Sequence, residues 1–318
     1  MNLQVLKQLE NQIAELKEVS TKHNLDFNEV INNLEQKVNE IKIHLNENME
    51  VWDKIQLSRI QQRPTTLDYI DHIFEDFIEL HGDRLYGEDP ALVSGIATFE
   101  GMPITVLGNQ KGKNTKDNIY RRFGMSQPEG YRKALRIMQQ ANKFNRPIVT
   151  FINTAGAFPG REAEERGQSQ AIALNLREMA SFGVPIICFV VGEGGSGGAL
   201  ALGIGNRIYM LENTFYSVIS PEGAAALLWK DATQAKRAAE ALKITAKDLM
   251  ELEVIDEIIK EPVGGAHIDI PLQSHFIKET LRKALQELGQ LDKGTLRQQR
   301  FDKFRKIGEY IEERTLNK

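Results

Sequence analysis

Two stretches of the sequence repeat the same order of residues, and this repeat restricts the fold more than any other feature. Pro147 begins the run PIVTFINTAGAFPG, and Pro185 begins the run PIICFVVGEGGSGG. In each run a proline precedes a nearly continuous apolar segment, a glycine-rich turn and a predicted helix. Strands that are apolar along their whole length are typical of a sheet covered on both faces. The repeat therefore predicts an α/β protein whose strands lie between layers of helices.

Further strands and helices surround the two runs. The segment RIYML predicts a strand, and FYSVISPEGAAALLW predicts a strand, turn and helix in which Ser220 and Pro221 are typical of a helix start. Upstream, LVSGIATFEGMPITVLGNQ predicts two strands joined at Glu100-Gly101. Alternating strands and helices imply right-handed crossovers, in either a doubly wound sheet or a spiral of repeated units.

The two ends of the chain have a helical pattern instead. Apolar residues recur at steps of three and four through residues 3–16 and again through residues 27–45, which predicts a helical hairpin with narrow apolar stripes. A periodic helix is also predicted from Pro64 to near Gly82. We expect three parts: a helical assembly segment (1–60), a main domain (61–290) and a C-terminal helix (291–318).

Charge and cysteine content exclude several classes of protein. The formal net charge of -4 gives no reason to expect general nucleic-acid binding, so any basic surface must be local. Cys188 is the single cysteine, which excludes a disulfide framework and a multi-cysteine zinc site within this chain, and no metal is expected in it. The sequence lacks a signal-like start and any apolar window of about 18 residues. We therefore expect a cytoplasmic protein without membrane contact.

The run from Gly192 to Ala199, GEGGSGGA, fits several functional patterns. It contains G-x-G-x-x-G followed by Glu212 at the distance of a ribose-binding acid, which indicates a dinucleotide site, although such a turn normally follows the first strand of its fold. It also contains G-x-S-x-G around Ser196, followed by Asp256 and His267 in the order of a serine-hydrolase triad. Neither pattern uses all of the glycines.

A third interpretation uses the glycines themselves. Residues without Cβ let a substrate oxygen approach the peptide N–H groups at a helix start, where the helix dipole favours negative charge. An oxyanion hole needs such a turn. The same glycines also suit a turn that only packs a helix closely against a strand.

A group of basic residues lies upstream of the two runs. It is a candidate for binding the phosphates of a nucleotide, a nucleic acid or an acidic carrier protein, although charged runs more often form a solvated face. The group consists of Lys111, Arg121, Arg122, Arg132 and Lys133.

Six motifs occur together in a fixed order: QKG at 110–112, FGM at 123–125, PEGYRKALR at 128–136, AEERGQS at 163–169, GEGGSGGALA from 192 and YSVISPEGAA from 216. With these motifs the chain closely resembles the family of α subunits of the carboxyltransferase component of bacterial acetyl-CoA carboxylase. The resemblance runs from about residue 65 to about residue 270, with a similar helical extension before it. One departure is TAGAFPG at 154–160, where the family usually has Thr-Pro-Gly-Ala-Tyr-Pro-Gly.

The resemblance implies a crotonase-type fold, a spiral of ββα units, and transfer of a carboxyl group from carboxybiotin on a separate carrier protein to acetyl-CoA. The product is malonyl-CoA, at the first committed step of fatty acid biosynthesis. The implied oxyanion hole consists of the backbone N–H groups of Gly197 and Gly198, which would serve the biotin ureido oxygen. Positions that would shape the substrate site around it are Gly156, Ala157, Gly160, Gly194 and Gly195.

The resemblance also implies partners. The active site would be shared with a β subunit that binds most of acetyl-CoA and carries a zinc ribbon, and the single cysteine of this chain agrees with zinc lying in the partner. An α2β2 assembly would work with biotin carboxyl carrier protein and biotin carboxylase. Two alternatives stay open. One is a self-contained crotonase-type hydratase or hydrolase of acyl-CoA, which needs its own acid or base, and the other is a regulatory subunit whose basic group binds nucleic acid.

Overall fold

The structure is a computed structural model and describes residues 12–20, 22, 26–47 and 49–308 of the 318-residue chain. Residues 12–20 are helical and precede α2 (Asn28–Glu47). The strands are β1 (Glu75–Glu79), β2 (Leu92–Phe99), β3 (Met102–Asn109), β4 (Ile148–Thr154), β5 (Ile186–Gly195), β6 (Arg207–Leu211), β7 (Phe215–Ser217) and β8 (Glu257–Ile259).

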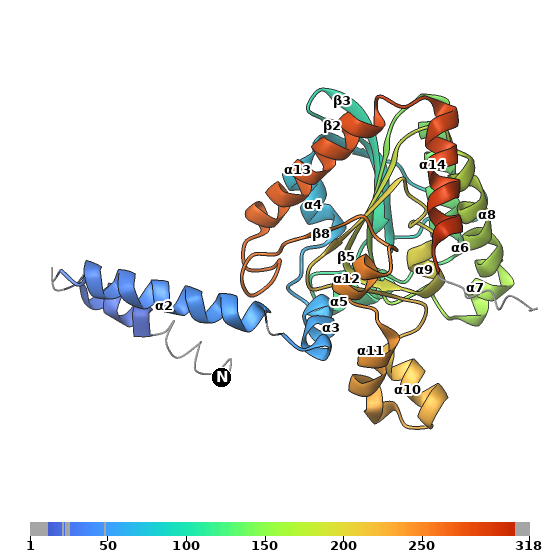
Figure 1. Cartoon of the computed structure of the whole chain (residues 1–318). Helices are drawn as coiled ribbons and strands as arrows, with labels where there is room; N and C mark the ends of the chain where they lie inside the picture. The colour runs from blue at the N-terminus through green and yellow to red at the C-terminus, as the bar shows by residue number, and fades with distance from the viewer. Residues whose placement is uncertain (1–11, 21, 23–25, 48, 309–318) are drawn as a thin grey trace, which may run out of the picture.

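The remaining helices connect or cover these strands (Figure 1). They are α3 (Val51–Arg59), α4 (Thr66–Ile73), α5 (Thr115–Tyr120), α6 (Pro128–Lys143), α7 (Arg161–Glu165), α8 (Gln168–Ser181), α9 (Ser196–Leu200), α10 (Pro221–Trp229), α11 (Ala235–Leu242), α12 (Ala246–Glu251), α13 (Ile270–Leu288) and α14 (Lys293–Lys306), with short 3₁₀ turns η1 (Arg122–Gly124) and η2 (Ala232–Gln234). In the described residues no helix is both long and apolar enough to span a membrane.

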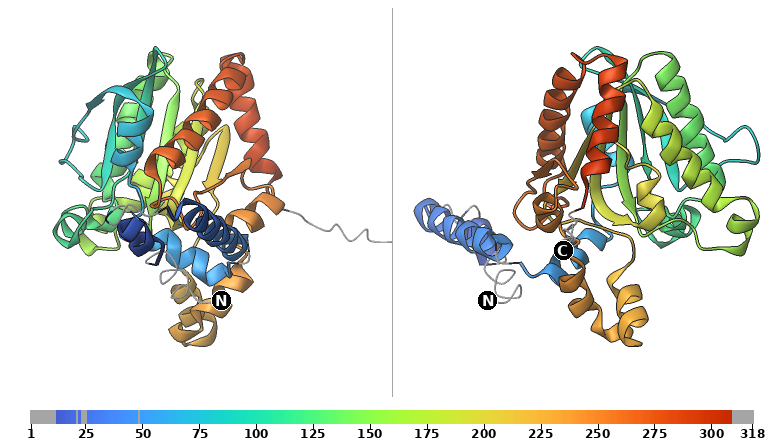
Figure 2. Two further views of the ribbon diagram at one scale, coloured as in Figure 1. Left: turned by 90° about the vertical axis from the view of Figure 1, so that its left-hand side faces the viewer. Right: turned by 45° about the vertical axis from the view of Figure 1, so that its right-hand side comes forward.

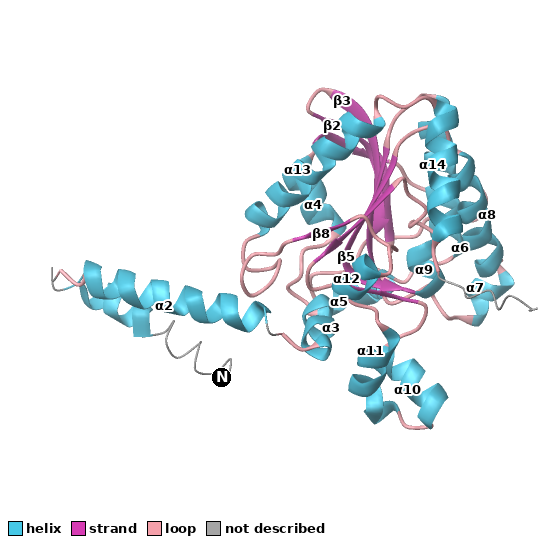
Figure 3. Cartoon of the chain, in the orientation of Figure 1, coloured by secondary structure: helices cyan, strands magenta, loops and turns pink. Residues whose placement is uncertain are grey.

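The strands form one mixed sheet of eight strands (Figure 3). The order is β1-β2-β3-β4-β5-β6-β8, with β7 branching from β5. β1, β2 and β3 pair antiparallel, and β2 and β3 form the hairpin predicted around Glu100-Gly101. From β3 onward every pair is parallel, so the carboxyl ends of β4 and β5 lie at the same edge of the sheet.

Both faces of the parallel strands are buried, as the apolar runs predicted. Along β5, Ile187 and Phe189 belong to one core, and Ile186 and Cys188 belong to the other. The first core is closed by α4 and α13, and the second by α6 and α8, on the opposite side of the sheet in Figure 1. Burying each large apolar side chain contributes roughly 1.5–3 kcal/mol, so these strands hold the sheet rigidly.

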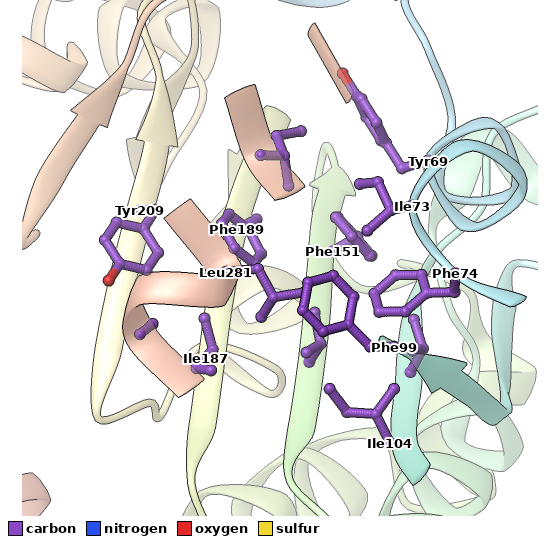
Figure 4. Close-up of a cluster of buried hydrophobic side chains, with 14 of the residues drawn as sticks. Tyr69, Ile73, Phe74, Phe99, Ile104, Phe151, Ile187, Phe189, Tyr209 and Leu281 are labelled. Atoms are coloured by element: carbon purple, nitrogen blue, oxygen red, sulfur yellow. The ribbon is translucent and has the colours of Figure 1, made fainter. Parts of the chain in front are cut away.

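A row of aromatic rings crosses the first core. Tyr69 of α4 stacks on Phe151 of β4 at 5.6 Å between ring centroids, Phe151 stacks on Phe189 of β5 at 5.6 Å, and Phe189 stacks on Tyr209 of β6 at 5.3 Å (Figure 4). Offset aromatic pairs at this spacing are favourable beyond the area they bury. The row ties α4 to three neighbouring strands.

The predicted helical hairpin is seen from residue 12 onward, since residues 3–11 of the prediction lie outside the described residues. It stands beside the body in Figure 1 and in the right view of Figure 2, and it lies in front of the body in the left view of Figure 2. Ile13 of the first helix packs against Ile31 and Val38 of α2, and Lys17 pairs with Glu35 at 2.6 Å. In contrast α3, which also precedes residue 60, packs on the body, because Ile55 is fully buried beside Phe215 of β7.

The helix predicted from Pro64 to Gly82 is wrong in its second half. α4 ends at Ile73, and β1 begins at Glu75. Asp76 has φ 51°, and the pairing of β1 with β2 is irregular between Glu75 and Ile78. Such a bulge inserts one extra residue, so Phe74 and Phe77 reach the same core although they are three positions apart. The bulge thus gives this strand apolar residues three positions apart, which is the spacing expected of a helix.

Candidate active site

Two turns meet at the edge of the sheet where β4 and β5 end. A methyl group on Gly195 would lie 2.1 Å from the carbonyl oxygen of Ala155, and one on Gly198 would lie 2.5 Å from the carbonyl carbon of Gly156. Both distances are far below van der Waals contact, so the two backbones touch only because glycine has no Cβ. The turn after β4 is held by Thr154, whose hydroxyl accepts the N–H of Gly156 at 3.1 Å and donates to its carbonyl at 2.7 Å.

The second turn begins α9. Gly197 and Gly198 are its second and third residues, where backbone N–H groups have no acceptor within the helix. Gly197 is partly exposed, and a methyl group there would meet only Ile172, at 3.5 Å. Gly198 is buried against the first turn. The two predicted oxyanion-hole residues therefore differ in their surroundings, because Gly197 is partly exposed whereas Gly198 packs against the first turn, and their role in binding an oxyanion stays a prediction.

The other predicted wall residues have mixed surroundings. A methyl group added at Gly156 would lie 3.8 Å from the Cβ of Ser196, and Ala157 is partly buried against the cluster of Tyr131, Ala171 and Ala201. Gly160 caps α7 beside the ring of Phe158. Gly194 and Gly195 are buried within the pairing of β5 with β7. Substrate contact by these five residues stays a prediction.

The serine-hydrolase interpretation fails on distance. Asp256 accepts the N–H of Ile208 at 2.6 Å, and Ile208 faces Cys188 near the amino end of β5. Ser196 follows the other end, and eight residues of strand span roughly 26 Å. Asp256 is therefore far from Ser196 in the structure. The dinucleotide interpretation also fails on position, because the turn follows the fifth strand rather than the first.

The basic residues singled out in the sequence are paired with carboxylates. Four of these pairs join residues more than 30 positions apart, so the sequence pattern gave no sign of them. The pairs are Lys111–Glu193, Arg121–Asp117, Arg122–Asp89, Arg132–Asp83 and Lys133–Glu88. A phosphate or nucleic acid would have to compete with these carboxylates, and such a role stays a prediction.

Most of these pairs fasten the loop between β1 and β2, residues 80–91. Asp83 is central, since its Oδ1 accepts the N–H groups of Leu85, Tyr86 and Gly87 at 3.0, 2.8 and 2.9 Å, and its Oδ2 accepts Arg132 Nε at 2.8 Å. Burial alone would raise the pKa of Asp83, but these donors outweigh burial and lower the pKa to about 2. The loop is therefore held by a carboxylate that must stay ionised.

Asp83→Asn is expected to make the free energy of unfolding depend less on pH under acidic conditions. A carboxyl whose pKa is lowered on folding stabilises the protein above its unfolded pKa, near 4, and loses that effect as the pH falls toward 2. The shift corresponds to about 2 kcal/mol at neutral pH. Urea unfolding at pH 7, 5, 4 and 3 measures the free energy of unfolding of both proteins. The difference in this free energy between the wild type and the variant should become smaller below pH 4. A gap that stays constant with pH would contradict it.

A pocket of about 150 Å³ lies next to the two turns. Its lining includes Arg59, Lys111, Asn153, Ala155 and Glu193. Sequence reasoning missed Arg59, because α3 was assigned to the assembly segment, and it passed over Glu193, the one acidic residue within the glycine run. In the described part of the chain no cluster of three or more His, Cys, Asp or Glu side chains is placed to hold a metal ion.

Solved structures with the same fold are carboxyl-transferring and decarboxylating enzymes. Transcarboxylase 12S superposes with a TM-score of 0.60 at 18% identity, over 73% of this chain and 43% of the transcarboxylase chain. The β subunit of P. aeruginosa geranyl-CoA carboxylase gives a TM-score of 0.55 at 18% identity, over 70% of this chain and 41% of that chain. A Pseudomonas malonate decarboxylase MdcD-MdcE hetero-dimer gives 0.52 at 20% identity, over 63% and 82%. The chain is therefore an α/β protein of the crotonase fold, as the resemblance implied.

Sequence relatives narrow this class to one family. The chain belongs to the acetyl co-enzyme A carboxylase carboxyltransferase-like family, which matches residues 3–308. It is 60% identical over 302 residues to the acetyl-coenzyme A carboxylase carboxyl transferase subunit alpha of Bacillus cytotoxicus, covering 95% of this chain and 93% of the relative. The subunit alpha of Staphylococcus carnosus is 59% identical over 312 residues, covering 97% and 98%.

Proposed function

We propose that this chain is the α half of an acetyl-CoA carboxylase carboxyltransferase, which moves a carboxyl group from carboxybiotin on a separate carrier protein to acetyl-CoA. The observation that carries the proposal is the start of α9, where the partly exposed Gly197 and the buried Gly198 lie in the first turn of the helix, and Gly198 packs against the turn after β4. The product would be malonyl-CoA, and the reaction would begin fatty acid biosynthesis. The family to which the chain belongs supports the same reaction.

The chemistry needs a group that stabilises negative charge rather than a nucleophile. When bound, carboxybiotin would supply the carboxyl group that acetyl-CoA accepts at its methyl carbon, and the N–H groups of Gly197 and Gly198 would face the ureido oxygen, which would carry the negative charge. Backbone N–H groups at a helix start are already oriented toward such an oxygen, and the helix dipole adds to their effect. Removing one donor of this kind typically costs on the order of 3 kcal/mol in the barrier. In this arrangement Ser196 is a spacer.

The proposal includes a partner subunit. Transcarboxylase 12S is more than twice as long as the part that this chain matches, and the malonate decarboxylase is described as a hetero-dimer. Both descriptions support a site completed by a second fold of the same kind, here a zinc-carrying β subunit in an α2β2 assembly. The α2 hairpin, which packs mainly on itself, would serve assembly, and the C-terminal helix would cover the body. Biotin carboxyl carrier protein and biotin carboxylase would complete the enzyme, in the cytoplasm.

The direct test is malonyl-CoA formation from acetyl-CoA and carboxybiotin, with and without the purified β subunit. The mixture should be active, and each subunit alone should be inactive. Activity of this chain alone would contradict the half-site arrangement and favour the self-contained alternative. An inactive mixture, with both subunits folded and associated, would contradict the proposed function.

A further inference from the structure

Strand β5 changes its neighbour just before the glycine turn. Its residues Ile187–Val190 pair with β6, whereas Glu193–Gly195 pair with β7. On the other edge the register with β4 shifts between Ile152 and Thr154. The last three residues of β5 therefore leave the ladder with β6, pair instead with β7, keep one pairing with β4 through Gly194 and Thr154, and lead directly into α9.

One side chain anchors this short segment. The run from Gly192 to Gly198 has only two residues with side chains, Glu193 and Ser196, and Ser196 is exposed. Glu193 is 7% exposed. The glycines of the run hold it through backbone pairing and close backbone contacts alone, so Glu193 is its one buried side chain that can fix the turn from outside the sheet.

Those contacts come from distant parts of the chain. Arg59 Nε of α3 donates to Glu193 Oε1 at 2.8 Å, and Lys111 Nζ, after β3, donates to Oε2 at 2.5 Å. The N–H of Glu193 donates to Asn153 Oδ1 at 3.1 Å. The guanidinium of Arg59 also lies 5.2 Å from the ring centroid of Phe215, which is the register partner of Glu193 in β7. Both oxygens and the backbone of Glu193 are thus held from three directions.

We propose that Glu193 is a positioning residue for carboxyl transfer: held by Arg59 and Lys111, it sets the direction in which Gly197 and Gly198 present their N–H groups. The proposal rests on the proposed function. Charge-assisted hydrogen bonds are about twice as strong as neutral ones and are more directional. A displacement of about 1 Å in a group that binds the transition state costs on the order of 100-fold in rate. Weakening the contacts of Glu193 with Arg59 and Lys111 should therefore lower kcat before it unfolds the protein.

The test is Glu193→Gln in the assembled α/β enzyme. The expected result is a fall in kcat of at least about tenfold with an unchanged KM for acetyl-CoA, because Glu193 affects the stabilisation of the transition state and not the binding of acyl-CoA. Glu222→Gln is the matched control: Glu222 is the other carboxylate of Arg59, at 2.6 Å, and within the described part of the chain it forms no hydrogen bond or ion pair with the glycine run. Its kcat should stay within about twofold of the wild type. Lys111→Met removes the second cation and serves if Glu193→Gln fails to fold, with a fall of at least about threefold.

A second measurement separates positioning from general stability. Amide hydrogen exchange over residues 194–200 should be faster in Glu193→Gln and unchanged in Glu222→Gln, whereas exchange in β4 should stay as in the wild type. If the wild-type enzyme is active and the kcat of Glu193→Gln stays within twofold of it, the inference is overturned while the proposed function stands. A fall in kcat without faster exchange over residues 194–200 would overturn the inference in the same way. An inactive wild-type mixture would overturn the proposed function, and this inference with it.

Discussion

Gly198→Ala is expected to reduce carboxyl transfer by at least about 100-fold. The added methyl would lie 2.5 Å from the carbonyl carbon of Gly156 and 2.6 Å from the N atom of Ala157, and both are backbone atoms that cannot rotate away. The two turns must then separate by about 1 Å, a displacement that costs on the order of 100-fold when it affects groups that bind the transition state. The measurement is kcat for malonyl-CoA formation by the assembled enzyme.

Gly197→Ala is the matched control, since it adds the same methyl one residue earlier. There the methyl would meet only Ile172, at an ordinary contact distance of 3.5 Å, and the backbone N–H is retained. A loss of less than about tenfold is expected. Equal losses of kcat in the two variants would mean that the packing of the two turns does not determine activity. Full activity of Gly198→Ala would mean that Gly198 is not part of the active site.

Arg63→Met is expected to lower the free energy of unfolding by about 3–5 kcal/mol. The Arg63 and Glu261 side chains are 1% and 0% exposed and pair at 2.5 Å, and Arg63 Nε also donates to the carbonyl of Val191 in β5 at 2.6 Å. Burial works against the charge of Glu261, but Arg63 keeps its pKa below the ordinary value. Without Arg63 a carboxylate in the core loses its counter-charge. Urea unfolding at pH 7 measures the effect.

Two variants show whether burial is the cause. Arg161→Met breaks an exposed pair with Glu165 and should cost less than about 0.5 kcal/mol. Arg63→Met combined with Glu261→Gln should be less destabilising than Arg63→Met alone, because the charge left without a partner is removed as well. A double variant less stable than the single one would contradict this explanation.

The central part of the fold could be predicted because its signals are local. The apolar segments after Pro147 and Pro185 became β4 and β5, covered on both faces as their composition required. Glycine and proline marked the turns. The resemblance then named the crotonase fold, which periodicity had left open between two α/β arrangements.

The rest depends on partners that are distant in sequence. Arg59 looked like part of the assembly segment because nothing near it shows that Glu193, 134 positions away, accepts its hydrogen bond. Lys133 looked like part of a basic surface, yet it is fully buried and bonded to the carbonyl of Asp89. Charges in a sequence can be counted, but whether they face solvent or one another is decided only when the chain has folded.

The separate hairpin has a consequence for the order in which a nascent chain gains structure. Its contacts join residues that are close in sequence, such as Ile13 and Ile31. Helical structures with such local contacts fold within microseconds to milliseconds. The sheet closes only when β8, ending at Ile259, pairs with β6. At a synthesis rate of 5–20 residues per second, roughly 10–40 s pass between the emergence of α2 and that of β8. The hairpin is therefore expected to be folded on the ribosome well before the body exists.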